Sequence, residues 1–325
     1  MTMNKTPIQN HLPKASRLIY GCMGLGGSWD NAPYSQQDID LAHQAVNTAL
    51  ECGINYFDHA DIYTMGKAEQ VFGEVLKARP ELREQIILQS KCGIRFEDAH
   101  GPKRYDLSPE WIEESVNNIL SRLGTEYLDT LLLHRPDPLM QPELIAEAFD
   151  RLQSAGKVRH FGVSNMNQHQ ISLLQSQIKQ PLVINQLPLS LSQADFVEDA
   201  VLVGTGDSAN VGYTAGLTDY CKQNDIQLQS WGCLAQGLFS GRNLDGQPPH
   251  VHATAGLVRE MAHGYQTSAE AIVLAWLMQH PATIQPVLGT THEGRLRACA
   301  MATQVQLSRE DWYKLFVTAR GQELP

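Results

Sequence analysis

The sequence contains no apolar run long enough to cross a membrane. Hydrophobic residues make up 42% of its 325 residues, but no stretch reaches the roughly 18 uninterrupted apolar residues that a membrane-spanning helix requires. Residues 1–14 are polar and lack the apolar segment of a secretory signal peptide. We therefore expect a cytoplasmic protein that has no membrane partner.

The sequence also lacks a disulfide framework and a basic surface. Its six cysteines are dispersed, without a C-x-x-C pair or a short His-Cys cluster, which favours reduced thiols and predicts no metal site. The formal net charge is −10, and the 25 lysines and arginines form no basic block. A nucleic acid is therefore not an expected partner.

Short apolar runs alternate with amphipathic helical stretches along the chain. The runs typical of strands are 17–21, 54–58, 85–91, 127–134, 158–163, 182–186, 226–231 and 284–288. One predicted helix starts at Ser108-Pro109, where a capping serine precedes a proline in the first turn. No internal repeat or linker divides the chain. The pattern predicts an α/β fold, a single (β/α)₈ TIM barrel over residues 15–325 after a polar tail of residues 1–14.

The principal alternative is a doubly wound open sheet. Gly21, Gly24 and Gly26 follow the first strand, but Asn31-Ala32-Pro33 separate them from the next helix, whereas a dinucleotide-binding turn opens a helix at once. The barrel is favoured because most strands end on polar residues, and barrel enzymes build their sites at the carboxyl ends of the strands. The residues at these ends are Asp58, Lys91, His134, Ser164, Asn165, Gln186, Trp231, Gly289 and Thr290.

Each of these residues has an ordinary structural explanation when taken alone. A lysine at a strand end is most often solvated, and a histidine after three leucines is more often a hydrogen-bonded core residue. Asp58 can be a helix cap, and Tyr63 can be a half-buried packing residue. Their joint occurrence on one face of a barrel favours a shared chemical task.

Four of these side chains fit acid catalysis on a carbonyl group. A phenol has an ordinary pKa of about 10 and transfers protons poorly near neutrality. Lys91 beside Tyr63 would lower the pKa of the phenol toward neutrality, and Asp58 would keep Lys91 charged. His134 would donate a hydrogen bond to the oxygen on which charge develops. The missing nucleophile is a hydride, which a nicotinamide would supply.

At this point the chain resembles the aldo-keto reductases, and within them the bacterial oxidoreductase branch related to the potassium-channel β subunits. The resemblance covers nearly the whole chain, and its motifs are residues 53–63, 89–91, 129–134, 156–165 and 185–186. It implies NADPH-dependent reduction of an aldehyde or ketone. Tyr63 would be the proton donor, Lys91 and Asp58 would tune its pKa, and His134 would orient the carbonyl.

The resemblance also implies that the cofactor is NADPH rather than NADH, and it indicates which residues bind this cofactor. Ser164, Asn165 and Gln186 match the positions that bind the carboxamide, and Trp231 matches the aromatic residue that stacks on the nicotinamide. The pyrophosphate loop corresponds to Gly232, Leu234, Gln236 and Gly237, and the 2′-phosphate site corresponds to Gly289, Thr290, Thr291 and Arg295. Gly289 replaces the usual lysine of this segment, and Ala298 and Cys299 replace the usual adenine contacts.

The substrate is expected to be a small carbonyl compound. Trp29, Tyr63 and His134 are the predicted pocket walls. The segment 92–107 and an irregular stretch, 187–213, are expected to reach over the barrel mouth.

Three other functions fit parts of the pattern. Lys91 could form a Schiff base in an aldolase, although a neighbouring Asp58 favours a charged lysine. Asp58, His59, Asp61 and His134 could serve a metal-dependent hydrolase, but conventional ligand spacing is absent. The third is a regulatory, redox-sensing subunit that holds NADPH with slow turnover, as the channel relatives suggest.

Overall fold

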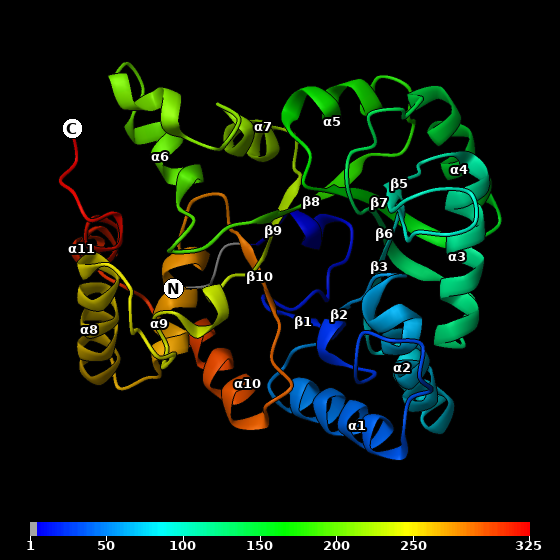
Figure 1. Cartoon of the computed structure of the whole chain (residues 1–325), viewed down its shortest axis with the longest axis horizontal. Helices are drawn as coiled ribbons and strands as arrows, with labels where there is room; N and C mark the ends of the chain where they lie inside the picture. The colour runs from blue at the N-terminus through cyan, green and yellow to red at the C-terminus, as the bar shows by residue number, and fades with distance from the viewer. Residues whose placement is uncertain (1–4) are drawn as a thin grey trace.

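Eight parallel strands close into a barrel at the centre of the molecule (Figure 1). The computed structural model describes residues 5–325. In the order of pairing, the strands are β1 (Ile19–Gly21), β2 (Tyr56–Asp58), β3 (Ile87–Cys92), β6 (Leu128–Leu133), β7 (Val158–Ser164), β8 (Leu182–Pro188), β9 (Gln227–Trp231) and β10 (Gln285–Leu288). β1 pairs with both β2 and β10, which closes the barrel. The predicted (β/α)₈ fold is confirmed, and an open doubly wound sheet is excluded.

Helices surround the barrel and cover the outer face of its strands. The ring contains α1 (Gln36–Glu51), α2 (Lys67–Ala78), α3 (Pro109–Leu123), α4 (Pro142–Ser154), α5 (Gln168–Gln175), α7 (Leu217–Gln223), α9 (Ala269–Met278) and α10 (Glu293–Ala300). The side chains of Ser35, Ser108 and Ser268 accept backbone hydrogen bonds at the starts of α1, α3 and α9. Gly124 ends α3 with a left-handed φ of 63°, which glycine adopts at little cost.

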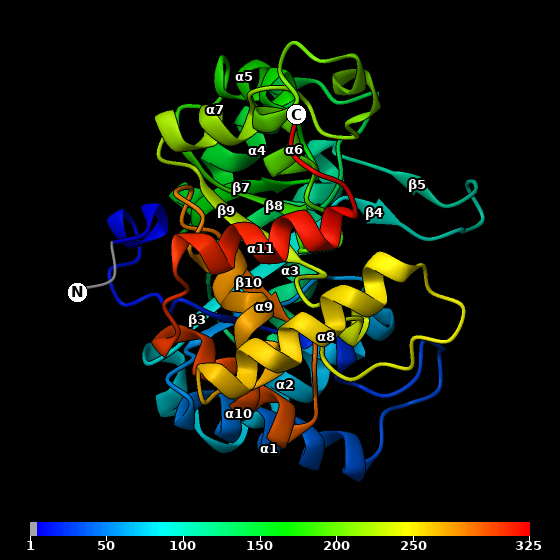
Figure 2. The same ribbon diagram turned by 90° about the vertical axis from the view of Figure 1, so that its left-hand side faces the viewer.

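Two helices outside this ring cover α9. α8 (Pro249–Gly264) and α11 (Arg309–Arg320) lie side by side along one flank of the barrel (Figure 2). Trp276 of α9 stacks on Trp312 of α11, with ring centroids 5.1 Å apart. Because the barrel and these helices enclose α9, eight of its residues are buried and it is apolar on every side.

Two insertions follow strands at the carboxyl end of the barrel. β4 (Ile94–Arg95) and β5 (Arg104–Tyr105) form an antiparallel hairpin that projects from the molecule (Figure 2). The helix α6 (Asp195–Val201) lies in the segment 187–213, which the sequence suggests is irregular. That suggestion is wrong for α6, where burial of Phe196 and Val197 stabilises a short helix.

The described part of the N-terminal segment belongs to the barrel core. Pro7–Asn10 form a 3₁₀ helix, and Ile8 and Leu12 are 0% and 9% exposed. The Ile8 backbone N–H donates to Oε1 of Gln227 at 3.4 Å, inside β9. The polar tail predicted for residues 1–14 is therefore not a tail from Pro7 onward; residues 1–4 lie outside the described residues.

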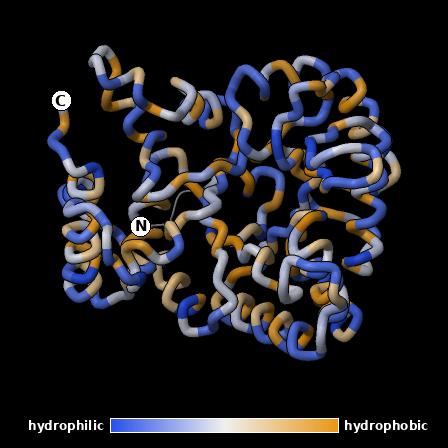
Figure 3. The backbone as a smooth tube through the Cα atoms, viewed as in Figure 1, coloured by the Kyte–Doolittle hydropathy of each residue, from blue (hydrophilic) through white to orange (hydrophobic). Residues whose placement is uncertain are grey.

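Apolar side chains form two separate cores. The larger core lies between the strands and the helices. The helix faces that point away from it are mostly hydrophilic (Figure 3). The smaller fills the amino-terminal end of the barrel and includes Ile8, Leu12, Ile19, Tyr56, Ile87, Leu132, Val183, Ile184 and Val287. Within residues 5–325, no helix has the length and apolar character needed to cross a membrane.

Candidate active site

Four side chains predicted from the sequence meet at the carboxyl end of the barrel. Asp58 is the last residue of β2, Lys91 lies near the end of β3, and His134 directly follows β6. Tyr63 begins a 3₁₀ helix five residues beyond Asp58. Because β2, β3 and β6 are neighbours in the barrel, these strand ends lie side by side.

Lys91 is the centre of this group. Its Nζ donates to Asp58 Oδ2 at 2.7 Å, to the His59 carbonyl oxygen at 2.9 Å and to Tyr63 Oη at 3.0 Å. Burial lowers the pKa of Lys91, but the Asp58 carboxylate and Tyr63 counteract this, so the pKa lies above its ordinary value. Lys91 is therefore a charged ammonium whose three hydrogens are all engaged.

Tyr63 lies in a more apolar environment than the sequence indicated. Burial raises the pKa of its phenol, and the charge of Lys91 opposes that effect only in part, so the pKa lies above the ordinary value. The expected shift toward neutrality is therefore not found. A phenol with a raised pKa retains its proton, which suits a proton donor better than a base.

His134 is a neutral imidazole at the edge of the group. Its ring meets the Tyr63 ring edge-to-face, with centroids 6.1 Å apart. Burial lowers the pKa of His134 well below its ordinary value, and the cations Lys91, Arg135 and Lys103 lower it further. A neutral ring can donate one hydrogen bond without adding a charge.

The loop after Tyr63 has an unusual backbone. Thr64, Met65 and Gly66 have φ angles of 47°, 61° and 88°, so three successive residues are left-handed. This conformation is costly for a β-branched threonine, and the Thr64 hydroxyl offsets part of the cost by donating to the Leu25 carbonyl oxygen at 2.9 Å. This hydrogen bond therefore holds the backbone that follows Tyr63 against Leu25.

The residues predicted to hold a carboxamide form a second cluster on β7, β8 and β9. Ser164 Oγ donates to the Gln186 carbonyl oxygen at 2.9 Å. Asn165 Nδ2 donates to Ser164 Oγ at 2.7 Å and to the His134 carbonyl oxygen at 3.3 Å. Trp231 Nε1 donates to Asn165 Oδ1 at 3.2 Å, and the residue is 37% exposed. The structure thus brings all four together next to His134.

The two segments predicted to bind phosphate follow β9 and β10. Gly232, Leu234, Gln236 and Gly237 lie in the loop after β9, where Ala235, Gln236 and Gly237 have successive left-handed φ angles of 47°, 56° and 80°. Gly289, Thr290 and Thr291 join β10 to α10, and Arg295 lies in the first turn of α10. The Thr290 hydroxyl accepts a hydrogen bond from the His292 backbone at 3.2 Å.

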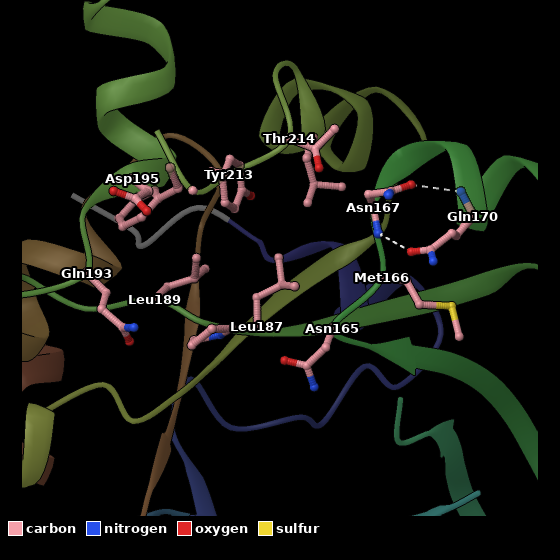
Figure 4. A pocket seen from close by; sticks show the side chains of 14 residues that line it. Asn165, Met166, Asn167, Gln170, Leu187, Leu189, Gln193, Asp195, Tyr213 and Thr214 are labelled. Atoms are coloured by element: carbon pink, nitrogen blue, oxygen red, sulfur yellow. Dashed lines mark hydrogen bonds between the residues drawn. The ribbon is translucent and has the colours of Figure 1, made fainter. Parts of the chain in front are cut away.

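Two cavities lie beside this site. One, of about 290 Å³, adjoins Asn165 and lies between the start of α5 and the segment after β8; Gln193, Asp195 and Tyr213 line it (Figure 4). The other, of about 310 Å³, adjoins Asp61. Trp29 lines neither cavity and is 51% exposed in the loop before α1, so its contact with substrate stays a prediction.

Comparison with known proteins identifies the family. A model described as "Aldo/keto reductase family" matches residues 17–316, nearly the whole chain. The chain belongs to the aldo-keto reductase family.

Relatives and solved structures agree with this assignment. The chain is 34% identical to the uncharacterized oxidoreductase YcsN of Bacillus subtilis, over 95% of this chain and 96% of the relative. It is 35% identical to a 6-dehydroglucose reductase of Agrobacterium fabrum, over 95% and 96% of the two chains. The aldo-keto reductase AKR11C1 from Bacillus halodurans, in its holo form, is 25% identical with a TM-score of 0.71, covering 93% of this chain and 92% of that one. This aldo-keto reductase is therefore an oxidoreductase.

Sequence reasoning missed polar residues inside the barrel. Gln89, Gln229 and Gln285 are fully buried and bond one another below Asp58. Their signal was present in β9, where Gln227, Gln229 and Trp231 alternate with Leu228 and Ser230. Alternate residues of a barrel strand point inward, so this spacing predicts glutamines in the interior.

Sequence reasoning also missed a pair of carboxyl groups near Tyr63, of which Glu69 is buried and Asp61 is half-buried. Glu69 is 0% exposed; it accepts from Arg122 Nε and from Ser90 Oγ, each at 2.7 Å. Asp61 lies nearby, and its Oδ1 is buried without a hydrogen-bond partner among the described residues. Burial and the charge of Glu69 raise the pKa of Asp61 to about 8.

The raised pKa of Asp61 predicts a pH-dependent stability. The folded protein holds this proton up to about pH 8, whereas an unfolded aspartate loses it near pH 4. Folding therefore binds a proton in this window, and the free energy of unfolding falls as pH rises from about 4 to 8. In thermal melts, Asp61→Asn should remove this pH dependence, so the stability of the variant relative to the wild type should increase as pH rises. A control, Asp245→Asn at an exposed site, should leave the slope unchanged; equal slopes in all three proteins would contradict a protonated Asp61.

Proposed function

We propose that this protein reduces a small aldehyde or ketone to an alcohol with NADPH, and that Tyr63 is the proton donor. The observation that carries the proposal is the position of one charged lysine between two partners. Lys91 Nζ lies 2.7 Å from the Asp58 carboxylate and 3.0 Å from the Tyr63 hydroxyl. The group can release a proton from Tyr63 and hold the resulting phenolate beside a cation.

The four side chains divide the work on the carbonyl group. A nicotinamide held at Ser164, Asn165 and Gln186 would supply a hydride for the carbonyl carbon. Tyr63 gives its hydroxyl proton to the carbonyl oxygen, and Lys91 stabilises the phenolate that remains. Asp58 keeps Lys91 charged, and the neutral His134 donates a hydrogen bond that orients the carbonyl oxygen. One hydride and one proton convert the carbonyl to the alcohol.

The residues present fit a nicotinamide cofactor. Gln186 Oε1 accepts no hydrogen bond within residues 5–325, which leaves an acceptor for a carboxamide N–H at the predicted position. The partly exposed Trp231 ring offers a flat apolar face beside it. Arg295 is exposed and forms no ion pair within the described chain, whereas Arg297 on the same helix pairs with Glu51 and Glu293. Arg295 is therefore available to a phosphate.

A titration and a turnover assay test the proposal together. Purified protein is titrated with NADPH and with NADH while tryptophan fluorescence is followed. The complex with the tighter nucleotide is then given a panel of carbonyl compounds that includes a sugar aldehyde, because one relative is named a 6-dehydroglucose reductase. Tight NADPH binding with many turnovers supports the reductase. One rapid hydride transfer followed by almost none would favour the redox-sensing subunit, and no nucleotide binding would reject both.

Arg295→Ala should separate the two nucleotides. A guanidinium forms strong charge-assisted bonds with phosphate, so the variant should bind NADPH roughly tenfold or more weakly while NADH binding barely changes. In the reciprocal variant, Gly289→Lys, the new side chain has room because a Cβ at Gly289 would meet no atom within 4 Å. Its positive charge should tighten the binding of NADPH, which carries the 2′-phosphate, more than the binding of NADH. Arg297→Ala is the matched control. Equal weakening of NADPH and NADH by Arg295→Ala would reject a role in 2′-phosphate binding.

A further inference from the structure

Four buried glutamines form a continuous network below Asp58. Gln89 comes from β3, Gln186 from β8, Gln229 from β9 and Gln285 from β10, so the network crosses the barrel interior. The exposed fractions of these side chains are 0%, 2%, 0% and 0%. Amides enclosed in this way are stable only when their hydrogen bonds are satisfied.

Two of the amides share the same pair of acceptors. Gln89 Nε2 donates to Asp58 Oδ1 at 2.5 Å and to Gln229 Oε1 at 2.9 Å. Gln186 Nε2 donates to the same two oxygens, at 3.2 Å and 3.0 Å. Each amide nitrogen carries two hydrogens, so both hydrogens of Gln186 are used inside the barrel. Its oxygen is the atom left for a ligand.

The amide nitrogen of Gln229 also has two acceptors, which hold the side chain in one orientation. Its Nε2 donates to Gln89 Oε1 and to Gln285 Oε1, each at 3.3 Å. Gln285 Nε2 in turn donates to the Ser16 carbonyl oxygen at 2.6 Å. A backbone carbonyl and a carboxylate accept hydrogen bonds and cannot donate them, so the acceptors at the two ends determine how every amide is turned. Gln89 donates to Asp58 on one side and to Gln229 on the other, and the donors continue through Gln229 and Gln285 to Ser16. Turning any amide over would place two acceptors in contact.

We propose that Gln229 is a positioning residue that makes Gln186 a pure acceptor toward the cofactor. Gln229 takes one hydrogen of the Gln186 amide, and Asp58 takes the other. Gln186 therefore selects a ring substituent that donates, such as the carboxamide of NADPH, and rejects one that only accepts, such as a carboxylate. Through Gln89, the same Gln229 oxygen helps to orient the Asp58 carboxylate that pairs with Lys91. This inference rests on the proposed nicotinamide-dependent function.

Substitution of Gln229 by methionine tests this role. Methionine has a similar volume but cannot accept the Gln186 hydrogen in the same way, so one hydrogen of Gln186 becomes free. The probes are NADPH, its analogue with a ring carboxylic acid, and adenosine 2′,5′-bisphosphate, which lacks the nicotinamide. The wild type should prefer NADPH over the acid analogue, and Gln229→Met should narrow that preference roughly tenfold. Binding of adenosine 2′,5′-bisphosphate should not change.

Two further variants separate positioning from general damage. Gln227→Met makes the same change two residues away on β9, at a buried glutamine that bonds to Ile8, Leu228 and Thr283 instead; it should keep the wild-type preference. Gln229→Glu should keep it too, because burial favours the neutral carboxylic acid, which accepts with one oxygen and donates with the other. If Gln229→Met does not fold, Gln285→Met provides a second test. It removes an acceptor of Gln229 Nε2, so Gln229 is held less firmly with its oxygen toward Gln186, and the preference for NADPH over the acid analogue should narrow.

The outcomes distinguish this inference from the proposed function. An unchanged preference in folded Gln229→Met or Gln285→Met overturns the role of Gln229, as does equal narrowing in Gln227→Met. Weaker binding of adenosine 2′,5′-bisphosphate would show that the variant damages the fold rather than the amide. A wild type that binds NADPH but turns over no carbonyl overturns the proposed reductase and still leaves the binding comparison in force.

Discussion

Tyr63→Phe is expected to lower the turnover of any carbonyl substrate by roughly 10²- to 10⁴-fold, the usual contribution of a positioned acid. The phenylalanine keeps the ring that meets His134 edge-to-face and removes the hydroxyl that Lys91 contacts at 3.0 Å. Binding of NADPH should be nearly unchanged, because the hydroxyl acts only on the proton. The measurement is steady-state turnover with the best substrate, together with a fluorescence titration of NADPH.

A second tyrosine provides the matched control for this variant. Tyr20 is 0% exposed, and its hydroxyl has no hydrogen-bond partner within residues 5–325. Tyr20→Phe therefore removes the same atom from the same barrel without removing a described contact, and turnover should stay within about twofold of the wild type, as expected where no stated interaction is lost. Full activity in Tyr63→Phe would reject Tyr63 as the proton donor.

The fold was predictable because a barrel repeats a simple local pattern. A buried parallel strand such as Leu128–Leu133 is apolar except at Asp129 and Thr130, and helix starts such as Ser108 carry their own capping signal. Three of the four catalytic candidates, Asp58, Lys91 and His134, were predictable for a related reason, and Tyr63 follows five residues after Asp58. Polar residues at the carboxyl ends of adjacent strands must meet once the barrel closes.

The remaining features depend on distances and burial that the order of residues does not reveal. The sequence places Lys91 near Tyr63, but it does not say how far burial offsets the charge, and the direction of the pKa shift of Tyr63 was therefore wrong. The network that joins Gln186 to Gln229 links residues 43 apart in sequence. α6 was missed because only Phe196 and Val197 of its seven residues are buried, so it shows no helical repeat of apolar residues.

Removing Lys91 should have the largest effect on stability as well as on activity. Lys91 and Asp58 are 1% and 2% exposed in their side chains, so Lys91→Met leaves a buried carboxylate without its cation. Loss of one member of such a pair costs about 3–5 kcal/mol, which denaturant unfolding would detect, and carbonyl reduction should be lost in the same variant. A control is Lys179→Met, which breaks an ion pair whose members are 81% and 39% exposed and should leave the free energy of unfolding nearly unchanged.

The double variant Lys91→Met with Asp58→Asn separates the two roles of Lys91. It removes both charges and leaves an amide that can still bond to the Gln229 network, so most of the lost stability should return. Activity should not return, because Tyr63 would still lack the cation that stabilises its phenolate. If the double variant were as unstable as Lys91→Met alone, the unpaired Asp58 charge would not be the cause, and the packing of the lysine side chain would have to explain the loss. If it recovered activity, Lys91 would not be needed to stabilise a phenolate, and the proposed mechanism would fail at that step.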